Sequence, residues 1–168
     1  MKVLGKDQYI TKFETFIVIK KELEYVKNLN NQLCSNIILN KNDSCKEVNE
    51  KKFMKILLDR ILYNSIQKYI IDTSQHLIPK DFSTKNYVEL QPLFHDISRK
   101  IINFIKTIDV YNFDKKKKIQ MIDINCVNFV DLYVIMNYGD KKCEENQIEH
   151  VLKLLEDIHT TKSIEDEQ

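Results

Sequence analysis

The four histidines are the first residues to consider for chemistry, because an imidazole can bind a metal or activate a nucleophile near neutral pH. They are His76, His95, His150 and His159. Only His150 and His159 fall within one expected helix, and they stand nine residues apart. This is not the spacing of a metal-binding or nucleophile-activating set, so we expect the histidines to have surface or core-edge roles.

The cysteines and glycines indicate no active site either. The cysteines form no CxxC or mixed Cys/His spacing, which argues against structural zinc and against a disulfide framework. They are Cys34, Cys45, Cys126 and Cys143. With only two glycines, the chain has no loop that could cradle a phosphate. The sequence therefore predicts no catalytic, metal-binding or cofactor-binding residue, and a protein that is not an enzyme.

A run of four lysines opens an expected short helix, directly after Asp114 as its cap. The run is Lys115, Lys116, Lys117 and Lys118. Positive charge in the first turn of a helix opposes the helix dipole, at a cost of about 0.3–1 kcal/mol for each exposed residue. Contact with phosphate or with an acidic protein surface would offset this cost, so the run is a candidate basic contact patch. The plainer interpretation is a solvated face in a lysine-rich chain.

Length and composition are those of a soluble chain that buries a core. The 168 residues suffice for one domain, or for one small domain plus an arm. The net charge of +1 gives no overall positive field, so any contact with nucleic acid is expected to be weak or indirect. The first residues do not resemble a secretory signal, and no apolar run approaches the roughly 20 residues that span a bilayer. We expect a cytosolic or nuclear protein without membrane contact.

Residues 1–28 are expected to form an arm that docks on a partner. Residues 2–4 make a short strand candidate, and a lone strand needs a sheet edge to pair with. Since the rest of the chain supplies none, we expect this strand to join the sheet of another protein. A capping box at Thr11 and Glu14 then starts a helix that runs to about Asn28.

The remainder divides into a linker, a helical domain and a tail. Residues 29–50 collect Asn, Ser and Asp, which favour turns and predict the linker. Residues 51–159 carry apolar side chains at helical spacing, and a loop is expected over 76–87. Helices are expected over about 54–72, from Pro92 to about 108, over 115–123, from Asn128 to Tyr138 before Gly139, and over 145–158. Residues 160–168 form an acidic tail, and the fold class is mainly α.

The helix expected over 54–72 has a strong apolar stripe. Its members recur at three- and four-residue spacing, which is typical of an amphipathic helix. They are Met54, Leu57, Leu58, Ile61, Leu62, Ile66, Tyr69 and Ile70. With the helices that follow, this stripe predicts a compact bundle.

The block from Phe113 to Ile158 resembles a known family, the small stalk subunits of DNA-directed RNA polymerases. Within the family it resembles the polymerase III member, also called the calcitonin gene-related peptide receptor component; relatives are the fourth subunit of RNA polymerase II and the corresponding stalk subunit of the archaeal polymerase. Members carry a basic turn K-x-x-K-[IL]-Q, here Lys115, Lys118, Ile119 and Gln120. A helix ending in a leucine follows, here Leu132, and then E-x-x-I-E-x-[ML]-L, here Glu145, Ile148, Glu149, Val151 and Leu152. The opening MKVL and the Thr-x-Phe-Glu helix start also match in order.

The resemblance implies a non-catalytic subunit of RNA polymerase III in the nucleus. Its strand and first helix would pack on the larger stalk subunit, which carries an RNA-binding barrel, and residues 51–159 would resemble the helical domain called HRDC. The two subunits would project from the polymerase III core and support initiation on small non-coding RNA genes by contacting the TFIIB-related initiation factor. The expected partner face is Lys2, Val3, Leu4, Phe13, Phe16, Ile17 and Lys20.

Two other functions stay open. The equivalent RNA polymerase II subunit shares the fold but usually has a longer acidic amino end, so the start at MKVL favours polymerase III. An all-helical interaction protein of viral or survival-factor type would bind an amphipathic helix in a groove within residues 51–158. It would give MKVL no role.

Overall fold

The computed structural model describes residues 10–39, 46–124, 126, 128–137 and 143–159, and in these residues every regular element is a helix. In chain order they are α1 (Lys12–Leu39), α2 (Lys46–Thr73), the short 3-10 helix η2 (Lys80–Ser83), α3 (Tyr87–Ile108), the 3-10 helix η3 (Asp109–Tyr111), α4 (Lys115–Asp123), α5 (Phe129–Asn137) and α6 (Glu145–His159). The predicted mainly α class is confirmed. The strand expected at residues 2–4 and the tail at 160–168 lie outside the described residues.

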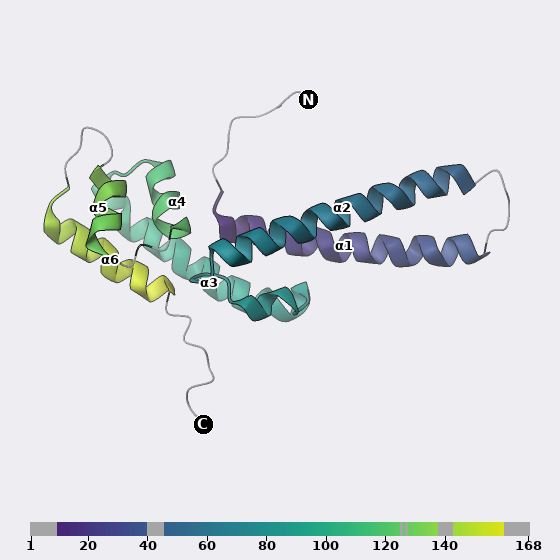
Figure 1. Ribbon diagram of the computed structural model, residues 1–168. Helices are drawn as coiled ribbons and strands as arrows, with labels where there is room; N and C mark the ends of the chain where they lie inside the picture. The colour runs from purple at the N-terminus through teal and green to yellow at the C-terminus, as the bar shows by residue number, and fades with distance from the viewer. Residues whose placement is uncertain (1–9, 40–45, 125, 127, 138–142, 160–168) are drawn as a thin grey trace.

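The helices form a long hairpin and a smaller bundle (Figure 1). α1 and α2 run antiparallel, pack along each other and project away from the other helices. α3 joins the two parts, because it contacts α1 and also α6. α5 packs against both α4 and α6 and completes the bundle.

Aromatic side chains fasten the base of the hairpin to the bundle. Phe13 and Phe16 of α1 meet Phe94 of α3 edge to face, with ring centroids 5.9 and 6.0 Å apart. Phe82 of η2 joins the group, 6.2 Å from Phe94. Each such pair contributes about 0.5–1.5 kcal/mol beyond the burial of its surface. The apolar faces of α3, α4, α5 and α6 continue the same core.

Three helix starts predicted from the sequence are confirmed. The Glu14 amide donates to Thr11 Oγ1 at 3.0 Å and the Thr11 amide donates to Glu14 Oε2 at 2.8 Å, which is the predicted capping box. Asp114 accepts a hydrogen bond from the Lys117 amide at 2.6 Å and so caps α4. Asn128 caps the start of α5 in the same way.

The predicted helix start near Pro92 is wrong. α3 begins at Tyr87, because Asn86 and Glu89 form a capping box. Asn86 Oδ1 accepts from the Glu89 amide at 2.9 Å, and the Asn86 amide donates to Glu89 Oε2 at 3.1 Å. These bonds satisfy amides that a helix start otherwise leaves unpaired. Pro92 lies in the second turn, where the helix forgoes one N–H donor.

The predicted end of the first helix near Asn28 is also wrong. α1 continues to Leu39 and α2 begins at Lys46, so helix occupies both ends of the segment 29–50 that was predicted as a linker. Asn and Ser disfavour a helix interior by only about 0.5 kcal/mol each. Packing between α1 and α2 along the hairpin offsets a cost of that size.

Candidate protein-interaction surfaces

The outer face of α2 carries an exposed row of large apolar side chains. This α2 row consists of Met54, Leu57, Leu58, Ile61, Leu62 and Tyr69, with exposed fractions between 39 and 62 %. Ile66 and Ile70 belong to the same stripe in the sequence, but Ile66 packs against the core and Ile70 is buried within it. The stripe therefore divides into a part that the chain covers itself and a part that it leaves open.

The α2 row has the properties of a docking surface. Its members span about 22 Å along one side of the helix, at a rise of about 1.5 Å per residue. Monomeric proteins seldom expose a contiguous apolar patch of more than a few hundred Å². Covering such a patch would favour association by about 25 cal/mol for each Å² of apolar surface. In the described part of the chain no helix, α2 included, is long and apolar enough to cross a membrane.

The partner face predicted in α1 lies against the chain's own core. Phe13 and Phe16 are 1 % and 0 % exposed, so they present no surface to another protein in this conformation. Ile17 packs against the same core. Residues 2–4, which complete the predicted face, lie outside the described residues. That this set of residues contacts a partner stays a prediction.

Lys20, the last member of that predicted face, ties α1 to the bundle. The Lys20 residue is buried, and its ammonium group donates to the carbonyl of Ser83 at 3.0 Å. Burial lowers the pKa of Lys20, and the carboxylates of Glu24 and Glu89 partly oppose that shift. One turn further along α1, Glu24 accepts a hydrogen bond from the Tyr87 amide at the start of α3. These contacts give Lys20 a structural role in the described chain.

The lysine run at the start of α4 divides into two residues that have partners and two that face outward. Lys117 donates at 3.0 Å to a carbonyl in the last turn of α5, where the negative end of the helix dipole stabilises a cation. Lys118 forms an ion pair with Asp109. Lys115 and Lys116 are exposed. Contacts within the chain therefore offset part of the cost of this run, and the surface it offers is mainly Lys115 and Lys116.

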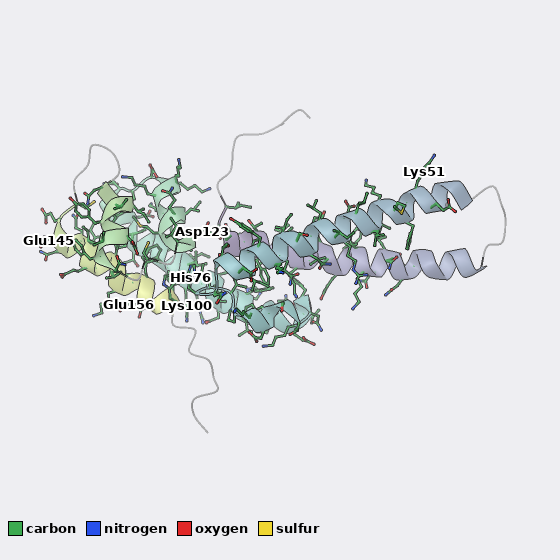
Figure 2. The ribbon with its side chains drawn as sticks, viewed as in Figure 1. Lys51, His76, Lys100, Asp123, Glu145 and Glu156 are labelled. Carbon is green, nitrogen blue, oxygen red and sulfur yellow. The ribbon has the colours of Figure 1, made fainter. Side chains whose placement is uncertain are left out.

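Titratable groups gather where the hairpin meets the bundle, near His76 and Asp123 (Figure 2). His76 Nε2 is hydrogen-bonded to the Ile122 carbonyl at 3.0 Å, and the Lys12 amide donates to Asp123 Oδ1 at 2.9 Å. Burial lowers the pKa of His76 and of the neighbouring His159, the latter to about 4, and raises that of Asp123. Within the described ranges, no three His, Cys, Asp or Glu side chains gather in a way that could hold a metal ion.

One comparison with known proteins shows the family to which the chain belongs. The sequence model of the RNA polymerase Rpb4 family matches residues 9–159. No curated protein and no solved structure matches the chain. The family match runs through both the hairpin and the bundle, so it does not depend on a motif at one end. The chain therefore belongs to the RNA polymerase Rpb4 family, whose members are non-catalytic subunits of the RNA polymerase stalk.

Proposed function

We propose that this chain is the small stalk subunit of RNA polymerase III, and that it supports initiation on small non-coding RNA genes in the nucleus. Because the chain belongs to the Rpb4 family, it is a subunit of an RNA polymerase stalk. The finer assignment is supported by the residues of the C-terminal block. There the basic turn from Lys115 to Gln120 and the pattern from Glu145 to Leu152 resemble the polymerase III member.

The larger stalk subunit is the partner in this proposal, and the α2 row is the observation that carries it. An open apolar face is unfavourable in water, and a subunit that works in a permanent heterodimer would keep it covered. Residues 2–4 add the proposed strand. Because Phe13 and Phe16 hold α1 on α3, we infer that they position the arm, while α2 supplies the contact area.

Contact with nucleic acid is indirect in this proposal. The chain has a net charge of only +1, and two of the four lysines in its basic run have partners within the chain. Affinity for the phosphate backbone grows with the number of phosphates that Lys and Arg neutralise, and two exposed lysines neutralise few. RNA binding would thus belong to the larger subunit, and contact with the TFIIB-related initiation factor to the assembled stalk.

Affinity purification of the tagged full chain from its own cells, followed by mass spectrometry, tests the assignment. The larger stalk subunit and the polymerase III core are expected to co-purify, without subunits specific to polymerase II. Recovery of polymerase II subunits instead would assign the chain to that enzyme. Recovery of neither polymerase would overturn the proposed role in transcription.

Deleting residues 1–9 tests the proposed strand and retains every core residue that the structure describes. A longer deletion, to residue 28, would remove Phe13 and Phe16 and so destabilise the whole base of the hairpin. The short deletion is expected to release the larger stalk subunit while the unfolding midpoint stays unchanged. If the deleted chain still recovers its partner at the full yield, the strand is not part of the interface.

A further inference from the structure

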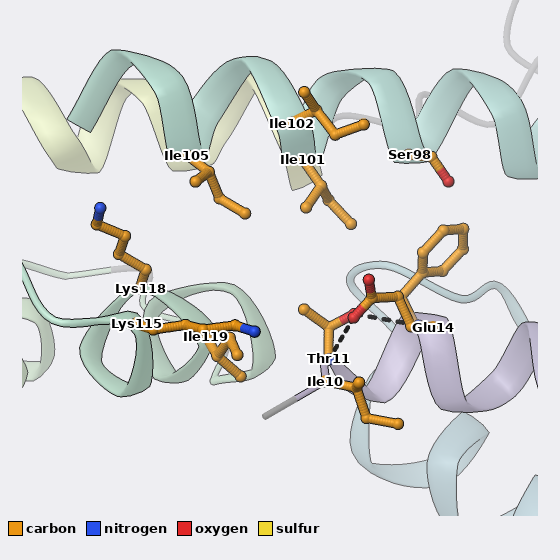
Figure 3. Close-up of a pocket in the computed structure, with 11 residues that line it drawn as sticks. Ile10, Thr11, Glu14, Ser98, Ile101, Ile102, Ile105, Lys115, Lys118 and Ile119 are labelled. Atoms are coloured by element: carbon orange, nitrogen blue, oxygen red, sulfur yellow. Dashed lines mark hydrogen bonds between the residues drawn. The ribbon is translucent and has the colours of Figure 1, made fainter. Parts of the chain in front are cut away.

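A half-open groove lies between the start of α1, the middle of α3 and the start of α4 (Figure 3). Its volume is about 570 Å³, within the range of about 300–1,000 Å³ usual for ligand pockets. Its apolar wall is formed mainly by isoleucines: Ile10, Ile101, Ile102, Ile105 and Ile119. Ile10 and Ile102 are 52 and 50 % exposed, so apolar surface is open to solvent on both sides of the groove.

Two lysines and one carboxylate border the groove, Lys115, Lys118 and Glu14. Glu14 Oε2 already accepts from the Thr11 amide and hydroxyl, at 2.8 and 3.1 Å. Lys118 is paired with Asp109. Lys115 is exposed and has no ion pair with any described residue, and its place in the first turn of α4 adds the positive end of that helix dipole.

A shallower hollow extends the groove along α3 and adds a second cation. The two share Ser98 and Ile102. Lys106 borders this hollow, is exposed, and makes no ion pair within the described ranges. Arg99 also borders it, but its guanidinium donates to Asp96 at 2.6 Å. The groove and the hollow adjoin and form one depression, in which neither Lys115 nor Lys106 makes an ion pair with a described residue.

We propose that this depression binds a segment of a partner protein that combines large apolar side chains with carboxylates, in the manner of an acidic amphipathic peptide. Apolar side chains of the segment would cover the isoleucines, and its carboxylates would face Lys115 and Lys106. Nucleic acid fits less well, because bases stack on aromatic faces and the phenylalanine that lines the groove, Phe13, is 1 % exposed.

The proposal also accounts for the position of the lysine run. Lys117 and Lys118 have partners within the chain, whereas Lys115 opposes the helix dipole without a partner in the described residues. A carboxylate from the bound segment would offset that cost. No residue of the α2 row lines the groove, so this site is distinct from that row.

Site-specific photocrosslinking in the full chain, expressed in its own cells, tests the groove. The residue p-benzoylphenylalanine is placed at Ile102, and in a second variant at Val88, which is exposed at the start of the same helix. Mass spectrometry of the cross-linked peptides then identifies the occupant. We expect Ile102, and not Val88, to cross-link to a segment of another protein that contains both carboxylates and large apolar residues.

Charge reversal supplies the second measurement. Lys115→Glu with Lys106→Glu should reduce the cross-link at Ile102 roughly fivefold to tenfold, since each change replaces attraction by repulsion. Lys21→Glu with Lys153→Glu, at two exposed lysines outside the groove, should leave it unchanged. Thermal unfolding of each variant shows whether the fold is intact.

Several results would overturn the proposal. They are a cross-link to residues 1–9 of the same chain, to a second copy, to a segment without carboxylates or to nucleic acid, and equal yields at Ile102 and Val88. The readout is the peptide joined at Ile102 rather than recovery of a polymerase. The groove proposal and the polymerase III assignment can therefore fail separately.

Discussion

The imidazole rings of His76 and His159 meet edge to face, with centroids 4.6 Å apart, at the junction of the hairpin and the bundle. His76 follows α2 and His159 ends α6, so this contact joins segments that are far apart in the sequence. Burial lowers the pKa of both rings, and charge on His76 would lower the pKa of His159 further. The folded state therefore favours neutral histidines at this contact.

This junction makes stability dependent on pH. The pKa of an unfolded histidine is about 6.5, so above that pH both rings are neutral in either state and the contribution to stability is complete. Below it the unfolded chain binds more protons, and stability falls until His159 titrates in the folded state near pH 4. Both rings are partly exposed, so we expect a loss of about 1–2 kcal/mol between pH 7 and 4.5, measured by urea unfolding. Asp123, whose pKa is raised, opposes the loss in the lower part of this window.

The matched variant for this prediction is His159→Phe. It keeps an aromatic ring against His76, and it breaks no hydrogen bond of Nε2 to a described residue, because that buried atom has no partner among them. The variant should lose less stability between pH 7 and 4.5 than the wild type, whereas His95→Gln, at an exposed position on α3, should behave as the wild type. An unchanged pH dependence in His159→Phe would assign the effect to other groups.

Replacing Phe16 tests where the first helix packs. Phe16→Ala removes a fully buried ring that contacts Phe82 and Phe94, and should cost about 3–5 kcal/mol in the free energy of unfolding. Val18→Ala, at a residue of α1 that is 55 % exposed, should change it by less than about 0.5 kcal/mol. If Phe16→Ala leaves stability intact and instead releases the larger stalk subunit, then α1 packs on that partner, as the sequence predicted.

Helix starts were predictable from the sequence where the signal is local. Thr11 and Glu14 are three residues apart, and each satisfies an amide of the other. The same signal exists at Asn86 and Glu89, but Pro92 is itself a common helix-start residue and led to a predicted start that was too late. The end of α1 could not be predicted in this way, since its asparagines favour turns, whereas packing between α1 and α2 favours a longer helix.

The sequence did not show which apolar residues the chain covers itself. A helical period places Leu58 and Ile61 on the same stripe as Ile70, yet the first two are 61 and 56 % exposed and Ile70 is 3 % exposed. Periodicity in a sequence predicts that a helix has an apolar face, but it does not predict what packs against that face. The partners of Lys117 and Lys118 could not be predicted from the sequence either, because α5 and η3 approach the lysine run only in the folded chain.

The lysine run offers a test of helix-end electrostatics. The Lys117 ammonium donates to the Met136 carbonyl at 3.0 Å, so Lys117→Met should destabilise the fold by about 0.5–1.5 kcal/mol. Lys116→Met removes an exposed cation from the same first turn and should be neutral or slightly stabilising. Urea unfolding of the two variants side by side checks the difference. Equal effects would mean that the carbonyl contact contributes nothing.

Charged substitutions in the α2 row should weaken binding to the larger stalk subunit while leaving the stability of the chain almost unchanged. Leu58→Glu with Ile61→Glu places two charges on an open face, so the free energy of unfolding should change by less than about 1 kcal/mol. Recovery of the larger stalk subunit with the tagged chain should fall at least about tenfold, because carboxylates cannot be buried unpaired against an apolar surface. Arg60→Glu with Asn64→Glu puts the same groups on exposed positions of α2 outside the row, and should bind normally. Normal binding by the Leu58 and Ile61 variant would move the interface away from α2, since an interface that tolerates two charges there does not cover the row.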